Sequence, residues 1–251
     1  MKISVVTVCF NSESTIANTI RSFLSQSHPD KEMVVVDGLS RDRTVEIVRS
    51  FGAPEISIVS EKDRGTYDAM NKGLDRYTGD AVGFLNSDDT YHDDQVLARI
   101  AAALENADAS FGDVLMVADH VGKRPVRTWR GSPYRRGIFH WGWMPPHPTF
   151  YARRSLVDAV GRFRLDYKIS ADYDFMLRAL ELRPVRAEYI PHILVDFMVG
   201  GTSTAGWRAV WRNNVECLNS RRQYLGAWPV DPAFVLKPAS KIFQLHWRTK
   251  P

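Results

Sequence analysis

The chain has 251 residues, 44% of them hydrophobic and 25% charged, which supports one large core and excludes a mainly disordered or disulfide-dependent protein. Its 2 cysteines, and the lack of an apolar run of the roughly 20 residues that a membrane span needs, predict a cytoplasmic protein. Residues 1–119 carry 11 Lys/Arg and 20 Asp/Glu, whereas residues 120–165 carry 10 Lys/Arg and 1 Asp/Glu. This asymmetry indicates an acidic half suited to a cation and a basic half suited to nucleic acid, an anionic membrane or a phosphorylated substrate. A solvated basic surface without a partner is the plainer alternative.

The first 119 residues alternate between two kinds of segment. Short runs rich in β-branched apolar residues are typical of buried parallel strands, and they occur at 3–9, 33–36, 56–60 and 81–85. Segments with apolar residues on one helical face lie between and after them, at 16–24, 44–51, 67–77 and 94–106. Strands that alternate with helices predict an α/β fold with a mostly parallel central sheet and helices on both faces.

The second half has a less regular pattern. Residues 132–148 are rich in Trp, Gly, Pro and His and show no clear period. We expect a strand pair at 109–118 and 125–129 and a helix at 172–182. Two further strands are expected at 185–190 and 194–199, and a last long helix near 207–224. This half is therefore expected to add a smaller subregion beside the sheet.

Ligands of open parallel sheets bind beyond the carboxyl ends of the strands, so the loops at those ends form the candidate site. These loops are 8–11, 37–40, 60–66 and 86–89. The last contains adjacent aspartates, Asp88 and Asp89, whose hard oxygen ligands suit Mg²⁺ or Mn²⁺ bound to a phosphate. A cap for the following helix is the alternative. The glycine-rich dinucleotide turn, the phosphate-binding GKS or GKT loop and the Gly-x-Ser-x-Gly elbow are missing, so a NAD or FAD site is not expected.

Four segments in order carry a resemblance to a known family. They read TVCFN at 7–11, VVDGLSRDRT at 35–44, DRGTYDAMNKG at 63–73 and FLNSDD at 84–89. These residues resemble the motifs of the family 2 glycosyltransferases, over about residues 1–200. The resemblance implies the Rossmann-like GT-A fold of nucleotide-diphospho-sugar transferases, with C-terminal helices, and sugar transfer with inversion. The third segment is most similar to bacterial members that build exopolysaccharide, capsule or O-antigen repeat units.

The resemblance also assigns residues to the nucleotide sugar. The residues expected to bind the nucleotide are Thr7, Cys9, Asn11, Asp37, Asp63, Gly65, Ser87 and Asp88. Among them Asp37 would accept a hydrogen bond from the base, and Asp88 would meet the ribose or the sugar. Asp89 would ligate Mn²⁺ or Mg²⁺ that bridges the diphosphate. Turn formation is the alternative for Asp37 and for Asp63.

An inverting transferase needs a carboxylate that takes the proton of the acceptor hydroxyl. The resemblance places this base in an acidic segment before an aromatic-rich helix, and this chain reads SADYD at 170–174. Asp172 aligns with the base, while Ala171 stands where the family often has Glu. Asp174 is expected to complement the start of the helix, and a simple capping role is the alternative for Asp172.

Less specific features point to the acceptor. His147 lies in a segment that family members often have near the acceptor, and Trp143 lies in a loop where its ring would stack on a sugar; ordinary packing is the alternative for both. Residues 201–251 carry 8 Lys/Arg, 2 Asp/Glu and four Trp, which favours contact with the inner, anionic face of a membrane. Packing of these Trp side chains on the core is the alternative.

Together these features predict a metal-dependent, inverting glycosyltransferase with a nucleoside diphosphate sugar as donor and a glycan or lipid-linked acceptor. Residues 1–119 would bind the nucleotide sugar, residues 120–200 would bind the acceptor and carry the base, and residues 201–251 would form a helical tail. A nucleotidyltransferase that makes sugar nucleotides is the enzymatic alternative, although a glycine-rich first loop is missing. A basic nucleic-acid-binding module is the non-enzymatic alternative, but no recognition motif accompanies the charge, so no nucleic-acid partner is expected.

Overall fold

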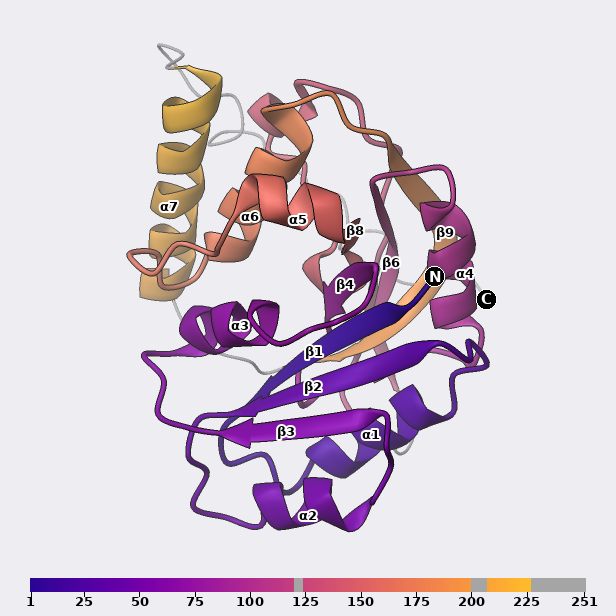
Figure 1. The fold of residues 1–251 in the computed structure, drawn as a ribbon. Helices are drawn as coiled ribbons and strands as arrows, with labels where there is room; N and C mark the ends of the chain where they lie inside the picture. The colour runs from indigo at the N-terminus through magenta and orange to yellow at the C-terminus, as the bar shows by residue number, and fades with distance from the viewer. Residues whose placement is uncertain (120–123, 200–206, 227–251) are drawn as a thin grey trace.

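A nine-stranded sheet forms the centre of the computed structural model, which describes residues 1–119, 124–199 and 207–226. The strands are β1 (Ile3–Cys9), β2 (Lys31–Asp37), β3 (Ile56–Ser60), β4 (Ala81–Phe84), β5 (Thr90–Tyr91), β6 (Ala109–Val117), β7 (Pro125–Trp129), β8 (Tyr151–Arg153) and β9 (Ala187–Met198). Their order is β3-β2-β1-β4-β8-β6-β9-β5, with β7 paired to β6 (Figure 1). β1 to β4 are parallel to one another, and β6 is parallel to β9, whereas β8 is antiparallel to both of its neighbours.

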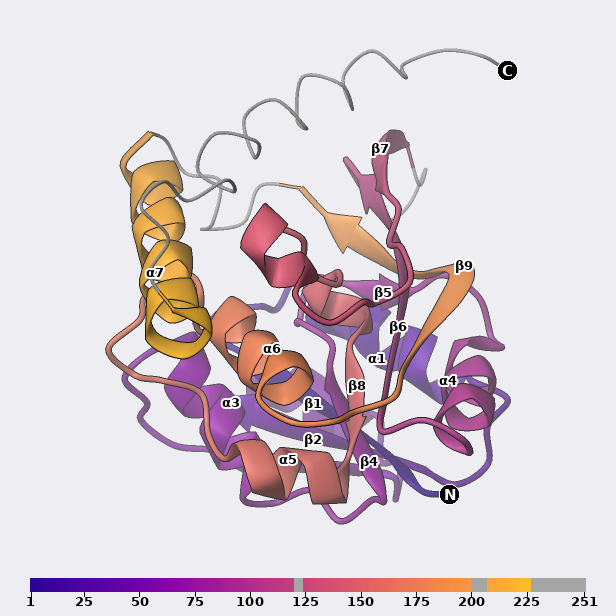
Figure 2. The same cartoon turned by 90° about the horizontal axis from the view of Figure 1, so that it is seen from above.

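Helices cover both faces of this sheet. They are α1 (Ile16–Leu24), α2 (Thr44–Ser50), α3 (Thr66–Leu74), α4 (Val96–Leu104), α5 (Arg154–Val160), α6 (Ala171–Glu181) and α7 (Trp207–Leu225), with the 3₁₀ turns η1 (Ile138–Trp141) and η2 (His147–Thr149). One apolar cluster packs α1, α2 and α4 on one face of the sheet, and a second packs α3, α5 and α6 on the other. Figure 2 shows α7 beside α6, outside this second layer. The structure is thus the expected α/β fold with a mostly parallel sheet.

The alternation of side chains along β1 explains the two clusters. Ile3 and Val5 belong to the cluster with α1, whereas Val6 belongs to the cluster with α3. On α1, Ile16, Ile20 and Phe23 are all fully buried, as their helical spacing predicts. At about 1.5–3 kcal/mol for each large apolar side chain buried, these two layers supply the main stabilisation of the sheet.

Three local features differ from the sequence prediction. The strands predicted at 185–190 and 194–199 are one strand, β9, whose pairing with β6 shifts register around Asp113. This bulge accommodates Pro191, which has no N–H to donate to a regular ladder. The short α5 was not predicted, because seven residues are too few to show a helical period. The two-residue strand β5 was not predicted either, and residues 227–251 of the predicted helical tail lie outside the described residues.

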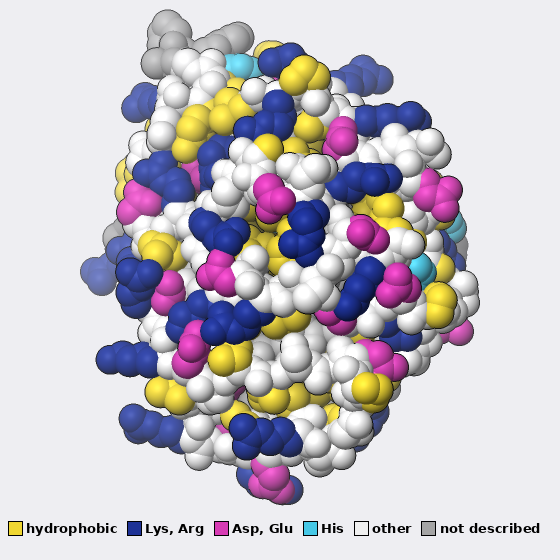
Figure 3. Space-filling model, viewed as in Figure 1, with side chains coloured by type: hydrophobic (Ala, Val, Ile, Leu, Met, Phe, Trp, Pro, Cys, Tyr) yellow, Lys and Arg dark blue, Asp and Glu magenta, His cyan; other side chains and the backbone are white. Residues whose placement is uncertain are grey.

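Charges of both signs are interspersed on the face seen in Figure 3, where Lys and Arg side chains alternate with Asp and Glu side chains. Within the described ranges, no helix combines the length and the apolar character that crossing a membrane requires. On this face the Lys and Arg side chains are therefore mixed with acidic ones rather than gathered into one basic stripe.

Candidate active site

A cleft of about 610 Å³ opens beyond the carboxyl ends of β1 and β4. Its lining comes from three segments of the first half, after β1, after β3 and after β4, and from segments of the second half that include η2 and the start of α6. The lining residues with polar or ionisable side chains are Cys9, Ser12, Asp63, Thr66, Tyr67, Asn86, Ser87, Asp88, Trp129, His147, Lys168 and Asp172. The cleft therefore brings together residues as far apart in the chain as Val8 and Phe197, where an α/β sheet is expected to bind ligands.

Three of the residues predicted to bind the base and ribose line this cleft: Cys9, Asp63 and Gly65. The Gly65 N–H donates to Asp63 Oδ1 at 2.8 Å, and Gly65 has a φ of +119°, a conformation that favours glycine. Burial, and next the charge of Asp37, raise the pKa of the Cys9 thiol, so this side chain stays neutral at physiological pH. This part of the cleft thus presents a neutral thiol and a carboxylate held by a backbone N–H, and contact of these groups with a base stays a prediction.

Asp37 does not line the cleft. Its side chain is fully buried, and its carboxylate accepts hydrogen bonds from the Ser40 N–H at 3.1 Å, from the Ser60 hydroxyl at 2.6 Å and from the Ser40 hydroxyl. Cys9 Sγ, which does line the cleft, lies 3.7 Å from Asp37 Oδ1. The position of Asp37 allows it to brace the loop that follows β2, and its contact with a base stays a prediction.

Thr7 and Asn11 also lie outside the cleft lining. Thr7 is fully buried, and its hydroxyl has no hydrogen-bond partner among the described residues. Asn11 has a φ of +51°, and its side-chain oxygen accepts from the Arg41 N–H at 2.9 Å. Asn11 therefore joins the loops after β1 and β2, and the binding roles of both residues stay predictions.

The adjacent aspartates differ in exposure. Asp88 lines the cleft together with Ser87, whereas Asp89 is fully buried behind them. Asp89 Oδ1 accepts from the Met198 N–H at 3.1 Å, and Oδ2 accepts from the Asn86 amide at 2.9 Å. Burial, and next the charge of Asp88, raise the pKa of Asp89 well above its usual range.

A divalent cation fits this pair. No group of three or more His, Cys, Asp or Glu side chains that could enclose a metal occurs in the described part of the chain. Mg²⁺ and Mn²⁺ do not need such a cage, because they keep several waters and bind through one or two carboxylates together with substrate phosphates. Two neighbouring carboxylates, one of them held away from water, form a site whose repulsion a cation would relieve.

Asp172 occupies the other wall, in the first turn of α6. It accepts a hydrogen bond at 3.1 Å from the hydroxyl of Tyr67 on α3, which lies 2.5 Å from the Ile169 carbonyl oxygen as well. Burial, and next the charge of Asp172, raise the pKa of Tyr67 far above its usual value, so the phenol remains a neutral donor. The half-buried carboxylate of Asp172 therefore sits in the cleft wall with its orientation set by Tyr67.

His147 lies near Asp172. Its ring stacks on Phe84 at a centroid distance of 6.1 Å, and its Nε2 is buried with no hydrogen-bond partner among the described residues. Burial lowers the pKa of His147, and the negative charge of Asp172 opposes this shift in part. A neutral imidazole with an unpartnered nitrogen therefore lines the cleft beside the predicted base.

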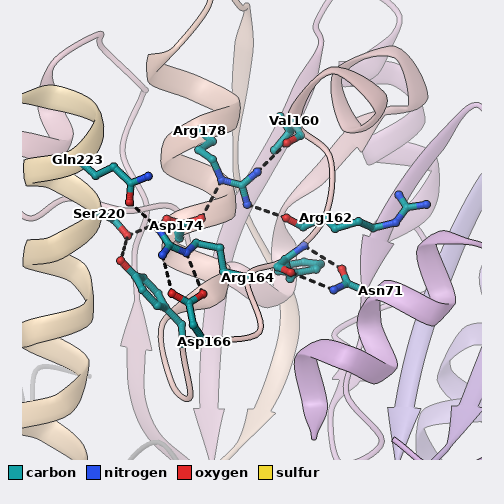
Figure 4. Close-up of polar contacts among 11 residues, drawn as sticks. Asn71, Val160, Arg162, Arg164, Asp166, Asp174, Arg178, Ser220 and Gln223 are labelled. Carbon is teal, nitrogen blue, oxygen red and sulfur yellow. Dashed lines mark hydrogen bonds and ion pairs between the residues drawn. The ribbon is translucent and has the colours of Figure 1, made fainter. Parts of the chain in front are cut away.

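Trp143 and Asp174 do not line the cleft. The Trp143 indole N–H donates to Ser132 Oγ at 2.9 Å, and its ring packs against Phe111 and Phe139. Asp174 is fully buried and accepts from Arg178 Nε at 2.8 Å and from Ser220 Oγ at 2.9 Å (Figure 4). Both side chains hold parts of the second half together, and their accessory roles stay predictions.

Sequence reasoning missed two residues that shape the cleft. Tyr67 lies inside the third family-like segment, so its place in that segment was a signal that could have marked it. Lys168 supplies a positive charge to the lining, and nothing in its local sequence distinguishes it.

The sequence is similar to those of known glycosyltransferases. The family model described as "Glycosyl transferase family 2" matches residues 4–161. A PGL/p-HBAD biosynthesis glycosyltransferase of Mycobacterium bovis (strain BCG) is 32% identical over 205 residues, covering 76% of this chain and 74% of the relative. A putative teichuronic acid biosynthesis glycosyltransferase of Bacillus subtilis is 37% identical over 122 residues, covering 47% of this chain and 48% of that protein.

Solved structures share the fold. The Staphylococcus aureus TarS fragment 1–349 superposes with a TM-score of 0.67 at 20% identity, covering 98% of this chain and 72% of that one, and it has also been solved with UDP-GlcNAc. The mannosyltransferase PcManGT from Pyrobaculum calidifontis, in complex with GDP-Man and Mn²⁺, superposes with a TM-score of 0.64 at 20% identity, covering 98% of this chain and 70% of that one. At this identity the likeness establishes the GT-A fold alone.

Proposed function

Because the chain belongs to glycosyltransferase family 2, we propose that it transfers a sugar, with inversion at the anomeric carbon, from a nucleoside diphosphate sugar to a glycan or lipid-linked acceptor. The observation that carries the proposal is one cleft with Asp63 and Gly65 on one side, Asp88 at the end of β4 and Asp172 across from them. The relatives' names place them in PGL/p-HBAD biosynthesis and, putatively, in teichuronic acid biosynthesis, which supports a glycan or lipid-linked acceptor.

Each wall has its own task in this proposal. The loops after β1 and β3 hold the base and ribose, and Asp88 meets the ribose or the sugar. Asp89 ligates Mn²⁺ or Mg²⁺, and such an ion supplies Lewis-acid stabilisation of the departing diphosphate. Asp88 is the rival ligand, because it lines the cleft and Asp89 does not.

The second wall carries the proton transfer. Asp172 accepts the proton of the acceptor hydroxyl as that oxygen attacks the anomeric carbon from the side opposite the diphosphate. Tyr67 holds one carboxylate oxygen and leaves the other to face the acceptor. The proton ends on Asp172, and the bond between the sugar and the diphosphate breaks, so the products are the glycosylated acceptor and a nucleoside diphosphate.

A donor screen tests the proposal. UDP-GlcNAc, UDP-glucose, dTDP-glucose and GDP-mannose are incubated with the protein, with Mn²⁺, Mg²⁺ or EDTA, and release of the nucleoside diphosphate is measured. Release from at least one donor, dependent on the metal, is expected. Thermal stabilisation by a nucleoside triphosphate but not by a diphosphate would instead favour a nucleotidyltransferase, and stabilisation by an oligonucleotide alone would favour a nucleic-acid-binding module.

Contact with a membrane is a separate part of the proposal. Trp211 on α7 and Trp141 on η1 are each 58% exposed, and these two elements pack against one another. Arg208 and Arg212 on α7 are exposed as well. Aromatic and basic side chains together favour an anionic lipid interface, where a lipid-linked acceptor would be found.

A further inference from the structure

A carboxylate from α7 holds the loop that precedes α6. Glu216 is 8% exposed, and its Oε1 accepts a hydrogen bond from the Lys168 N–H at 3.0 Å. Its Oε2 accepts from the Ile169 N–H at 3.0 Å and from the Ser170 N–H at 2.9 Å. One side chain thus takes three successive backbone donors, and charge-assisted hydrogen bonds of this kind are about twice as strong as neutral ones.

The held loop is part of the cleft. Lys168 and Ile169 line it, and Asp172 follows within the first turn of α6. The Tyr67 hydroxyl bonds the Ile169 carbonyl from the opposite side and reaches Asp172 as well. The loop is therefore fixed through its N–H groups by α7 and through a carbonyl by α3.

Further polar contacts join α7 to α6 and to the residues before it, in addition to the hold that Glu216 provides. Ser220 donates to Asp174 of α6 at 2.9 Å, and Arg164 donates to Gln223 at 2.5 Å (Figure 4). Ser170 donates through its hydroxyl to Asn213 Oδ1 at 2.8 Å, one turn before Glu216. These contacts join α7 to α6 and to the residue before it at two positions along the helix. Movement of Glu216 away from the loop would therefore break other contacts as well.

We propose that Glu216 is a positioning residue for the reaction, holding loop 168–170 so that Asp172 faces the acceptor oxygen. This inference rests on the proposed function, in which Asp172 is the base. A base works only within hydrogen-bond reach of the proton that it takes, and displacement by about 1 Å can cost roughly 100-fold in rate. Glu216 bonds loop 168–170, whereas the proposed nucleotide-binding residues Cys9, Asp63 and Asp88 lie on other loops.

Glu216→Gln tests the proposal, with Ser220→Ala as matched control on the same helix. Gln keeps the size of the side chain, but its NH₂ group must face at least one of the three N–H groups. We expect release of nucleoside diphosphate from the active donor to fall about 10- to 100-fold, while the dissociation constant for that diphosphate with Mn²⁺ stays unchanged. Ser220→Ala removes the bond to Asp174 and leaves the loop contacts in place, so it should lower the melting temperature and preserve turnover.

Amide hydrogen exchange gives a readout that does not need activity. Glu216→Gln should speed exchange at Lys168, Ile169 and Ser170, and Ser220→Ala should not. If Glu216→Gln does not fold, Asn213→Ala takes its place, with smaller effects in the same direction expected because it removes the partner of the Ser170 hydroxyl.

Three outcomes would overturn the positioning role: unchanged exchange at 168–170, diphosphate affinity lost in parallel with turnover, or turnover that follows melting temperature alike in both variants. Asp172→Asn is measured beside them to separate the two proposals. Full turnover in Asp172→Asn would refute the base itself, whereas an inactive Asp172→Asn with a fully active Glu216→Gln would refute the role of Glu216 alone.

Discussion

The side chain of Asp172 is short, half-buried and in contact with the phenol of Tyr67, which favours one direction of its carboxylate. A positioned base contributes about 10²- to 10⁴-fold to a rate. Asp172→Asn keeps the shape and removes the basicity, so we expect turnover to fall by about that factor. Binding of the diphosphate and Mn²⁺ should persist by calorimetry, because the proposed function assigns both to residues of the first half of the chain.

Asp174→Asn is the comparison for this variant. Asp174 is paired with Arg178 inside the protein, and removing one partner of a buried ion pair costs about 3–5 kcal/mol of stability. We therefore expect lower stability and milder loss of turnover for each folded molecule. An active Asp172→Asn beside an inactive, folded Asp174→Asn would move the base to Asp174.

The two aspartates after β4 make a second prediction at the level of single residues. Asp89→Asn should abolish the gain in diphosphate affinity that Mn²⁺ brings, about 10- to 100-fold if the charged contact is worth about 1.5–3 kcal/mol. Titration calorimetry with and without Mn²⁺ measures this gain. If Asp88→Asn loses the gain and Asp89→Asn keeps it, the cleft-lining residue is the ligand and Asp89 only supports the loop.

At the scale of elements, two roles must be separated for Asp37 at the end of β2. One is binding of the nucleotide, and the other is stabilisation of the loop that follows the strand. Asp37→Ala would remove the buried acceptor of the Ser40 and Ser60 hydrogen bonds, and each such bond is worth a net of about 0.5–1.5 kcal/mol. We expect a lower free energy of unfolding in urea and diphosphate affinity weakened by roughly ten- to a hundred-fold. Ser60→Ala removes one partner of Asp37 and touches no cleft-lining group, so it should lower stability alone. Affinity that is unaltered in Asp37→Ala would leave Asp37 as a loop-bracing residue.

The elements that were predictable from sequence are those with long, regular signals. The four parallel strands of the first half are continuous apolar runs, and α1 and α4 have clear buried stripes. The sequence prediction split β9 into two strands at Pro191, because the local sequence pattern does not show that a bulge opposite Asp113 accommodates this proline. The strand-end rule placed Cys9, Asp63, Ser87 and Asp88 in the cleft, but it did not say which of two adjacent aspartates faces outward.

Local sequence patterns do not predict contacts between segments that lie far apart in the chain. Tyr67 meets Asp172 across 105 residues, and Glu216 meets the loop at 168–170 across 46 to 48 residues. Such pairs have no fixed spacing, since they depend on how α3, α6 and α7 pack. The sequence therefore indicated the chemistry of the site, and packing decided its geometry.

At the scale of the whole molecule, the distribution of exposed aromatic and basic side chains leads to a prediction about membranes. The exposed side chains of Trp211 and Arg212 belong to α7, which lies on another part of the molecule than α2 (Figure 1). The protein should float with vesicles that contain phosphatidylglycerol, less so at high salt, because the attraction to anionic lipid is screened.

Matched variants sharpen this test. Trp211→Ala should weaken flotation at all salt concentrations, because it removes an apolar side chain that would insert into the membrane interface. Arg212→Ala should weaken it about five-fold at low salt only, as one basic residue near an anionic surface is worth about 1 kcal/mol. Arg49→Ala on α2 removes an exposed charge from another part of the molecule and should change nothing. Recovery of the wild-type protein below the vesicles under every condition, or an equal effect of Arg49→Ala and Arg212→Ala, would mean that α7 does not dock on lipid and that Trp211 serves another contact.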